Sequence, residues 1–407
     1  MTAPHSPDSS TYFRKGFGLK TEVQGDLAAD YNGDIVDRLI AEDYTLTVGD
    51  VTIRLAREFG FCYGVERAVE YAYQARRKFP NKRIFLVGEI IHNPHVNGRL
   101  RSMGVEILTR GEPTGAFDFS GIRPDDAVIL PAFGVTIDDF AALHAIGCVL
   151  VDTTCGSVLN VWKRVESYAR EGFTALIHGK YYHEETRATA SQVRKHDDGQ
   201  YLIVRNMDEA RVVCDYIEGR VGAAEISEKF AHAVSPGFDP EKHLQRIGVA
   251  NQTTMLARES LAIAQAVGDA IERAHGAEAR ARDFRSFDTI CSATQERQDA
   301  VRELLAEDVD LMVVIGGFNS SNTLSLASLC GEKVPTFHIH SADAIDPEHK
   351  TIHYRPVGLK HSEADARDWL PTGPVRVGIT AGASTPNSKI GDVVVRILAT
   401  RGLELEA

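Results

Sequence analysis

Short apolar runs alternate with longer segments of helical spacing from Val51 to the end of the chain. The short runs predict strands, and the longer segments, whose apolar residues recur every three or four positions, predict helices. The expected strands are 84–87, 127–130, 148–151, 175–177, 201–204, 247–250, 311–315, 336–339 and 375–379. The expected helices include 65–78, 159–170, 256–274, 295–306 and 392–400. Alternation of this kind is typical of α/β proteins, in which mainly parallel sheets are covered by helices.

The alternating pattern is long enough for several domains. Residues 1–50 are polar and are interpreted as an N-terminal extension that lies on the body of the protein. The expected domains are 51–151, 152–286 and 287–407. Two irregular stretches rich in Pro, Gly, His and charge, 219–245 and 341–374, predict surface insertions or linkers.

The charge balance narrows the class of protein. Acidic residues outnumber Lys plus Arg by 57 to 45, which gives a net charge of −12. Proteins that bind nucleic acid or an anionic membrane need a basic surface, so we expect neither a nucleic acid nor a membrane as a partner. No apolar stretch approaches the ~18 residues of a membrane span. The first thirty residues lack the apolar block of a secretory signal, and we expect a cytoplasmic protein.

The six cysteines form no local motif. No C-x-x-C pair occurs, which argues against a zinc ribbon and against a thioredoxin-type site. Three of them, however, come directly before a helical segment, namely Cys62, Cys155 and Cys291. Backbone N–H groups and the helix dipole favour a thiolate at such positions. Three thiolates can hold zinc with one open position, or an iron–sulfur cluster, and the residues alone leave both alternatives open.

The other three cysteines carry no such signal. Cys148, Cys214 and Cys330 lie in apolar strand or helix patterns. A cysteine in this setting usually acts as a small buried hydrophobe. We therefore predict a structural role for these three.

Two strand-to-helix turns carry groups that bind phosphate. The strand at 311–315 runs into a Gly-Gly-Phe-Asn-Ser-Ser-Asn segment, and the strand at 375–379 runs into Thr-Ala-Gly-Ala-Ser. Backbone N–H groups and hydroxyls at such turns bind anionic oxygen. Neither turn is a Walker loop, and no dinucleotide fingerprint is present. The sequence therefore predicts an anion site without a built-in nicotinamide or flavin.

The motifs as an ordered set resemble the LytB/IspH family. The matching pieces are Gly60–Val65 (G-F-C-x-G-V), Glu89–Asn93 (E-I-I-H-N), Asp152–Cys155 (D-T-T-C), His183–Glu185 (H-x-E), Asn251–Thr254 (N-Q-T-T), Cys291–Thr294 (C-x-A-T), Asn319–Asn322 (N-S-S-N) and Thr380–Pro386 (T-A-G-A-S-T-P). One piece alone is a weak signal, but their order over 51–398 is highly specific.

The resemblance implies a fold, a cofactor and a reaction. The implied fold class is α/β, with three αβα domains of mainly parallel sheet arranged as a pseudo-threefold trefoil around a central [4Fe–4S] cluster. The implied cluster ligands are Cys62, Cys155 and Cys291, which leave one iron to bind the substrate oxygen. The implied reaction is the reductive dehydroxylation of 4-hydroxy-3-methylbut-2-enyl diphosphate to isopentenyl and dimethylallyl diphosphate, the last step of the non-mevalonate isoprenoid pathway.

The resemblance also implies roles for individual residues. The residues that match the family positions for the diphosphate are His92, His183, Ser320, Ser321, Asn322 and Ser384. Glu185 matches the proton source, and Thr253 matches the hydroxyl that orients the substrate oxygen. A buried anion beside Glu185 would raise its proton affinity, which suits an acid near neutral pH.

One position departs from the family pattern. Phe133 stands where compact members have a histidine, and it cannot donate a hydrogen bond to phosphate. Either fewer groups hold the diphosphate, or a neighbour such as His95 or Lys180 compensates. Together with the extension at 1–50 and the insertion at 219–245, this departure resembles the longer plant and cyanobacterial-type subset, so a stromal location applies if the source bears plastids.

Two other functions use the same residues. One is a zinc or iron–sulfur hydro-lyase that acts on a phosphorylated metabolite. The other is a non-catalytic iron–sulfur sensor, which has no need of Glu185 or Thr253. For the reductase, the missing nucleotide fingerprint means that electrons come from a separate carrier, for which we expect a ferredoxin or flavodoxin.

Overall fold

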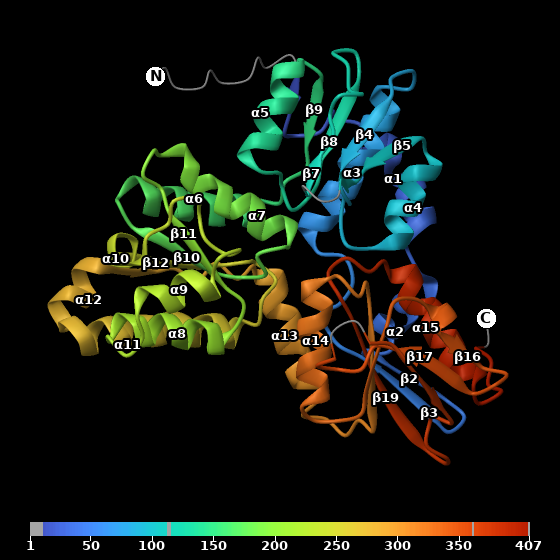
Figure 1. Ribbon diagram of the computed structural model, residues 1–407. Coiled ribbons are helices and arrows are strands. Elements are labelled where there is room, and N and C mark those ends of the chain that lie inside the picture. Colours follow the sequence, from blue (N-terminus) through green and yellow to red (C-terminus); the bar gives the residue numbers. More distant parts are fainter. Residues whose placement is uncertain (1–10, 112–114, 360–361, 406–407) are drawn as a thin grey trace. The chain divides into compact units, whose positions relative to one another are not determined.

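The computed structural model describes residues 11–111, 115–359 and 362–405. The chain forms two compact units, each assembled from three segments of the sequence. Unit 1 comprises 11–15, 81–88 and 106–291, and unit 2 comprises 16–80, 89–105 and 292–405. Both units are α/β, as the sequence predicted (Figure 1).

Unit 1 contains two largely parallel sheets, with the strand orders β1-β9-β8-β4-β5 and β11-β10-β12-β13. The strands are β1 (Tyr12–Phe13), β4 (Ile84–Val87), β5 (Val105–Leu108), β8 (Ala127–Leu130), β9 (Val149–Asp152), β10 (Thr174–His178), β11 (Tyr201–Val204), β12 (Ile247–Asn251) and β13 (Phe284–Ser286), with a short antiparallel pair, β6 (Arg110–Gly111) and β7 (Ala116–Phe117). The helices are α5 (Ile137–Ile146), α6 (Gly156–Arg170), α7 (Glu184–Ser191), η1 (Gln192–Lys195), α8 (Met207–Ile217), α9 (Ala223–Lys229), α10 (Pro240–His243), α11 (Ala257–His275) and α12 (Ala277–Asp283).

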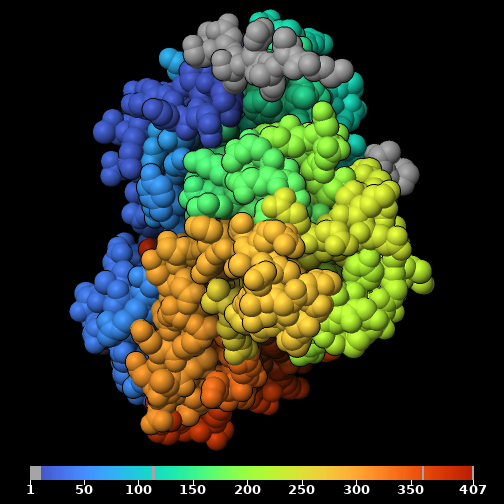
Figure 2. All heavy atoms as spheres, turned by 90° about the vertical axis from the view of Figure 1, so that its left-hand side faces the viewer, coloured from blue at the N-terminus to red at the C-terminus, as the bar shows by residue number. Residues whose placement is uncertain are grey.

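The second sheet of unit 1 is covered on both faces. Figure 1 shows α6 on one side of β10 and β12, with α8 and α11 on the other. Every residue of β10 and β12 is buried, which explains why these strands read as continuous apolar runs. The outer surface of the unit is polar where α11 passes into α12, since residues 272–278 are all exposed (gold in Figure 2).

Unit 2 is built on one sheet of order β15-β14-β19-β3-β2, parallel except for β2. Its strands are β2 (Thr45–Val48), β3 (Val51–Leu55), β14 (Leu311–Ile315), β15 (Thr336–Ile339) and β19 (Val375–Ala381), with a separate antiparallel sheet of β16 (Ile345–Asp346), β17 (Thr351–Tyr354) and β18 (Ala364–Arg367). The helices are α1 (Lys20–Tyr31), α2 (Asp34–Ala41), α3 (Tyr63–Lys78), α4 (Pro94–Ser102), α13 (Ser292–Leu304), α14 (Ser321–Gly331), η2 (Ala342–Ala344) and α15 (Asn387–Ala399).

Two regions of unit 2 that read as surface segments belong to its core. The N-terminal extension contributes α2, which packs on α15 through the fully buried Val36 and Leu39. The stretch at 341–374 contributes β16 to β18, and it buries Ile352 and Trp369 in the same core. Their few apolar residues are concentrated on one face, so an average polar composition concealed the packing.

The pairing of β3 links distant parts of the sequence. It runs parallel to β19, with Val51 opposite Val375 and Leu55 opposite Ile379. The strand that opens the first expected domain therefore lies in the sheet of the last one.

Within the described residues, no helix combines the length and the apolar composition that crossing a membrane requires.

Gly248 in β12 provides a test of how tightly unit 1 is packed. A Cβ at this position would lie 2.5 Å from the Tyr168 ring, which is held in place because its hydroxyl donates to the Val249 carbonyl at 3.1 Å. We expect Gly248→Ala to lower the free energy of unfolding by about 1–3 kcal/mol in a denaturant titration. Gly121→Ala in the same unit is the control, since nothing lies within 4 Å of its Cβ, and equal effects of the two substitutions would contradict the prediction.

Candidate active site

The three cysteines that precede helical patterns each lie at the start of a helix. Cys62 is the N-cap of α3 and Cys155 the N-cap of α6, both with extended backbone, and Cys291 comes directly before α13. All three are partly exposed. Cys62 belongs to unit 2, whereas Cys155 and Cys291 belong to unit 1. The predicted placement at helix starts is therefore confirmed.

Unit 1 connects one of these cysteines to the predicted acid. The Cys291 amide donates to the Thr253 carbonyl at 3.3 Å, and the Thr253 amide donates to Glu185 Oε1 at 2.6 Å. The Glu185 amide in turn donates to His183 Nδ1 at 3.2 Å. Four predicted residues from three separate segments are thus joined in one series of hydrogen bonds.

Glu185 lies in the interior of unit 1. It is in the first turn of α7 and is 1% exposed, although carboxylates are rarely buried without a specific reason. His183 is the N-cap of the same helix. Because its Nδ1 accepts a backbone hydrogen bond, the proton of the neutral ring is on Nε2. The local fold thus fixes both the place of the acid and the donor atom of the histidine.

Phe133 packs against that histidine. Its ring lies edge-on to the His183 imidazole, with 5.5 Å between centroids and an interplanar angle of 80°. Lys180 and His95 were the two residues expected to replace the phosphate donor that Phe133 lacks. The Lys180 backbone amide donates a hydrogen bond to Gln252 Oε1 at 3.2 Å, and the His95 ring lies edge-on to Tyr31 in unit 2. Phe133 therefore makes an apolar contact that helps to fix the orientation of the His183 ring.

Unit 2 joins the two predicted phosphate turns to His92. The Ser384 hydroxyl donates to the His92 carbonyl at 3.2 Å, and the Ala383 amide donates to Asn322 Oδ1 at 2.9 Å. Ser320 is the N-cap of α14, and Ser321 is its first residue. The amide of Cys62 donates to the Ala383 carbonyl at 3.2 Å. The turns after β14 and β19 thus lie side by side, and Cys62 is hydrogen-bonded to the turn after β19.

Asn322 has a donor without an acceptor. The residue is 2% exposed, and its Nδ2 has no hydrogen-bond partner among the described residues. An unsatisfied buried N–H group costs about 1–3 kcal/mol, so such groups persist where a ligand completes them. The Thr380 hydroxyl at the end of β19 is a second group of this kind. Both are suited to an anionic oxygen.

Two glycines allow the turns after β14 and β19 to pack closely against the backbone and side chains around them. A Cβ on Gly317 would lie 2.6 Å from the His92 carbonyl oxygen, which is backbone and cannot move aside. A Cβ on Gly382 would lie 2.0 Å from the Thr323 hydroxyl. Only glycine permits these contacts, which bring His92 and the two turns together.

A family model described as LytB protein matches residues 53–398 of the chain. The chain belongs to the LytB family. A relative from Thermosynechococcus vestitus, named 4-hydroxy-3-methylbut-2-enyl diphosphate reductase, is 48% identical over 400 residues, covering 97% of this chain and 96% of that protein. A relative of the same name from Gloeobacter violaceus is 46% identical over 402 residues, covering 97% of this chain and 94% of that protein. These matches confirm the resemblance inferred from the ordered motifs.

Two solved structures of reductases share the fold. One, of (E)-4-hydroxy-3-methyl-but-2-enyl diphosphate reductase, has a TM-score of 0.52 at 29% identity, and the match covers 86% of this chain and 99% of that one. The other, of the E-1-hydroxy-2-methyl-but-2-enyl-4-diphosphate reductase from Plasmodium falciparum, has a TM-score of 0.62 at 20% identity, covering 85% of this chain and 87% of that one. The second likeness supports the fold alone.

The remaining cysteines of this LytB-family chain are buried, as predicted. Burial raises the pKa of Cys148 to about 11, that of Cys214 to about 11 and that of Cys330 to about 12. A thiol with such a pKa is protonated near neutral pH and is a poor metal ligand. The six cysteines thus divide into three partly exposed ones at helix starts and three inert ones.

Glu89 was not singled out from the sequence, although it stands in the same family motif as His92. Its Oε2 lies 2.8 Å from His92 Nδ1 and accepts from Asn319 Nδ2 at 3.1 Å. Burial raises the pKa of Glu89, but the hydrogen bonds from His92 and Asn319 outweigh it and lower the pKa overall. The carboxylate therefore holds the imidazole, and the motif gave the only sequence signal for this role.

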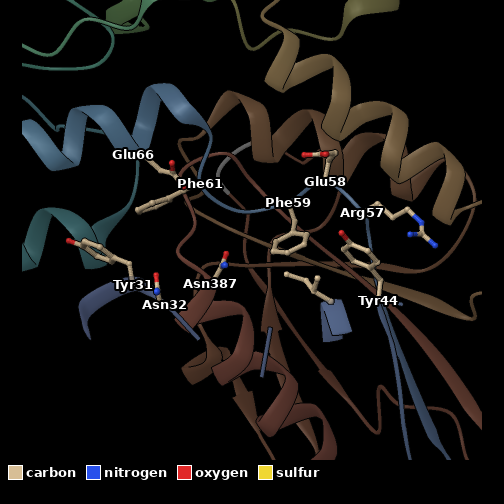
Figure 3. Close-up of a pocket in the computed structure, with 10 residues that line it drawn as sticks. Tyr31, Asn32, Tyr44, Arg57, Glu58, Phe59, Phe61, Glu66 and Asn387 are labelled. Carbon is tan, nitrogen blue, oxygen red and sulfur yellow. The ribbon is translucent and has the colours of Figure 1, made fainter. Parts of the chain in front are cut away.

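A pocket of about 260 Å³ lies beside the Cys62 turn in unit 2 (Figure 3). Two aromatic pairs line it: Tyr31 with Phe61, 5.4 Å between centroids, and Tyr44 with Phe59, 6.4 Å apart. No residue assigned a role from the sequence is among its lining residues. Because Phe61 directly precedes Cys62, this aromatic packing fixes the turn that carries the thiol.

Proposed function

We propose that this chain is a 4-hydroxy-3-methylbut-2-enyl diphosphate reductase, which removes the allylic hydroxyl of its substrate to give isopentenyl and dimethylallyl diphosphate in the last step of the non-mevalonate pathway. Relatives of that name match 97% of the chain. The observation that carries the proposal is the series Cys291, Thr253, Glu185 and His183 in unit 1. It joins a thiol, a hydroxyl residue and a buried acid, which a reductive dehydroxylation needs together.

The cofactor that we propose is a [4Fe–4S] cluster held by Cys62, Cys155 and Cys291. Soft thiolates are the usual ligands of iron–sulfur clusters, and these three are the partly exposed cysteines at helix starts. When bound, such a cluster supplies electrons one at a time and, with one iron free of protein ligands, a Lewis acid for the substrate oxygen.

The diphosphate is bound, in this proposal, by His92, His183, Ser320, Ser321, Asn322 and Ser384. The unpartnered Asn322 Nδ2 and the Nε2 proton of His183 are donors of the kind that phosphate oxygens accept. The N-terminal end of α14, which Ser320 caps, adds backbone N–H groups and the positive end of a helix dipole. Together these groups orient the substrate in this proposal.

Glu185 is the proton donor in this proposal, and Thr253 aligns the hydroxyl that leaves. The bond from the Thr253 amide to Oε1 holds the Glu185 carboxyl beside Thr253. Loss of water from an allylic alcohol needs that proton, because hydroxide is a poor leaving group.

The electron donor proposed is a ferredoxin or flavodoxin in the cytoplasm, or in the stroma of a plastid. The domain division 51–151, 152–286 and 287–407 also stays a proposal, in which each range corresponds to one lobe of a trefoil.

Anaerobic purification followed by metal and sulfide analysis tests the cofactor. We expect iron and acid-labile sulfide in equal amounts, about four of each per chain. The purified protein should then convert the hydroxylated allylic diphosphate in the presence of reduced ferredoxin. A colourless protein with one zinc ion and no sulfide would reject the reductase and favour the hydro-lyase.

The isosteric change Asn322→Asp tests the diphosphate site. It keeps the oxygen that accepts from the Ala383 amide but replaces the unpartnered donor by a negative oxygen. We expect the KM for the diphosphate substrate to rise at least ~10-fold, since a charge-assisted bond is replaced by repulsion. Asn206→Asp, at the N-cap of α8 where either residue caps equally well, should leave KM unchanged. An unaltered KM in Asn322→Asp would remove this residue from the site.

A further inference from the structure

The turn between β14 and α14 leads into three of the proposed diphosphate ligands, Ser320 at the N-cap and Ser321 and Asn322 at the start of the helix, yet the sequence of the turn is intrinsically flexible. It begins with Gly316, whose φ is +150°, and Gly317. Glycine pairs of this kind leave the backbone many conformations. Donors in a binding site must nevertheless be held close to their productive geometry. Some other part of unit 2 must therefore fix this turn.

Phe318 is the point at which the turn is held. The His340 ring stacks on it, with 5.4 Å between centroids and an interplanar angle of 8°. The His338 ring lies edge-on, with centroids 4.9 Å apart, and the Arg355 guanidinium lies 4.4 Å from the centre of the Phe318 ring. We call His338, His340 and Arg355 the Phe318 clamp.

The clamp also binds the backbone of the turn. Arg355 Nη1 donates to the Phe318 carbonyl at 2.7 Å, and His338 Nε2 lies 3.0 Å from the Gly316 carbonyl. A carbonyl only accepts, so His338 Nε2 carries the proton. Burial lowers the pKa of His338 to about 4, so the ring stays neutral near pH 7. The carbonyls of Gly316 and Phe318 are thus both held by the clamp.

Arg355 is not engaged by a close carboxylate. Its nearest ion-pair partner among the described residues is Glu363, with Oε1 3.9 Å from Nη2, and the Arg355 side chain is only 17% exposed. Glu363 instead lies 2.8 Å from His353 on β17. A half-buried guanidinium without a close counter-ion costs desolvation energy, which its contacts with Phe318 offset.

We propose that the Phe318 clamp positions the turn at Ser320, Ser321 and Asn322 for the substrate diphosphate, with Arg355 as its principal residue. The proposal rests on the proposed function, since it assigns those three residues to the diphosphate. The clamp residues are positioning residues: they act through Phe318 and the turn. The small sheet β16-β17-β18 thereby gains a role, because Arg355 directly follows β17.

Binding of inorganic diphosphate to the cluster-loaded enzyme, measured by calorimetry under anaerobic conditions, tests the clamp. Arg355→Met keeps the length of the side chain but loses both the charge and the donor. We expect its Kd to rise about tenfold, the equivalent of one charge-assisted hydrogen bond. Kinetics should show a raised KM with a smaller change in kcat. Arg367→Met, an exposed arginine on β18 of the same sheet, should leave both Kd and KM unchanged.

Two further variants separate positioning from a general loss of structure. Arg355→Lys keeps a cation near Phe318 and should recover part of the lost affinity. Phe318→Leu removes the ring that the clamp holds and should weaken binding as much as Arg355→Met. It also decides the matter if Arg355→Met does not fold. The double variant, with both Arg355→Met and Phe318→Leu, should bind diphosphate no more weakly than either single variant, because both substitutions remove the same contact between Arg355 and Phe318.

The outcomes distinguish this proposal from the function on which it rests. If the unaltered enzyme binds diphosphate and both Arg355→Met and Phe318→Leu bind it equally well, the clamp is overturned and the reductase proposal stands. If the unaltered enzyme binds no diphosphate and turns over no allylic diphosphate, the proposed function itself fails.

Discussion

Replacing Glu185 by glutamine is expected to reduce turnover by about 10³-fold or more while leaving the iron content and the cluster absorbance intact. General acids typically contribute 10²–10⁴-fold to a rate, and the protonation of a poor leaving group lies at the upper end of that range. Glutamine keeps an oxygen that can accept from the Thr253 amide, now 2.6 Å from Glu185 Oε1, so the turn that carries Thr253 is preserved. Only the transferable proton is lost.

The measurement is single-turnover reduction of the substrate, followed by product analysis, with the cluster spectrum recorded on the same sample. Glu166→Gln is the matched control: this residue of α6 in the same unit loses only a partly exposed ion pair with Lys195. Turnover in Glu185→Gln that equals the control would transfer the proton-donor role to another group. A loss of turnover together with the cluster would instead indicate a structural role.

Serine substitutions of the cysteines should divide into two sets of three. Cys62→Ser, Cys155→Ser and Cys291→Ser are each expected to lose most of the bound iron and all measurable turnover, because a serine hydroxyl is a hard, weakly acidic ligand that stabilises a cluster poorly. Cys148→Ser, Cys214→Ser and Cys330→Ser should retain iron and activity. The measurements are iron and sulfide per chain after anaerobic purification, and the absorbance of the cluster.

The second set is also a control for folding. Cys148, Cys214 and Cys330 are 2%, 6% and 0% exposed, so a serine there buries a hydroxyl and lowers stability without altering the proposed cluster ligands. A thermal melt can therefore fall in these variants while their iron content does not. Iron loss from any of them would contradict the assignment of ligands, as would full iron retention in any variant of the first set.

The strands of this fold were predictable where both faces of a sheet are buried. The runs 311–315 and 127–130 match β14 and β8 residue for residue, because continuous burial demands continuous apolar sequence. Helix starts were less well predicted: the helix expected at 392–400 begins at Asn387, since the polar Asn387, Ser388 and Lys389 carry no apolar period. Which strands pair was not predictable from the pattern, as β3 and β19 show.

The candidate site also has some features that a local sequence pattern predicts and others that depend on contacts between distant segments. The helix-start position of Cys62 and Cys155 follows from a local pattern, and the structure confirms it. The contact between Glu185 and Thr253 joins segments far apart in sequence, so only the family motifs, and no spacing rule, indicated it. Arg355 had no signal at all, because a polar, irregular stretch gives no hint that one of its residues returns to a distant loop.

The pairing of β3 with β19 has a consequence for synthesis on the ribosome. The sheet that supports the Cys62 turn is complete only after residues 375–381 have emerged, and the Cys62 amide needs the Ala383 carbonyl. By contrast, β10, β11, β12 and β13 all lie within 174–286 and can pair earlier in translation. The nascent chain therefore lacks the structural support of its Cys62 segment until its C-terminal residues have emerged from the ribosome.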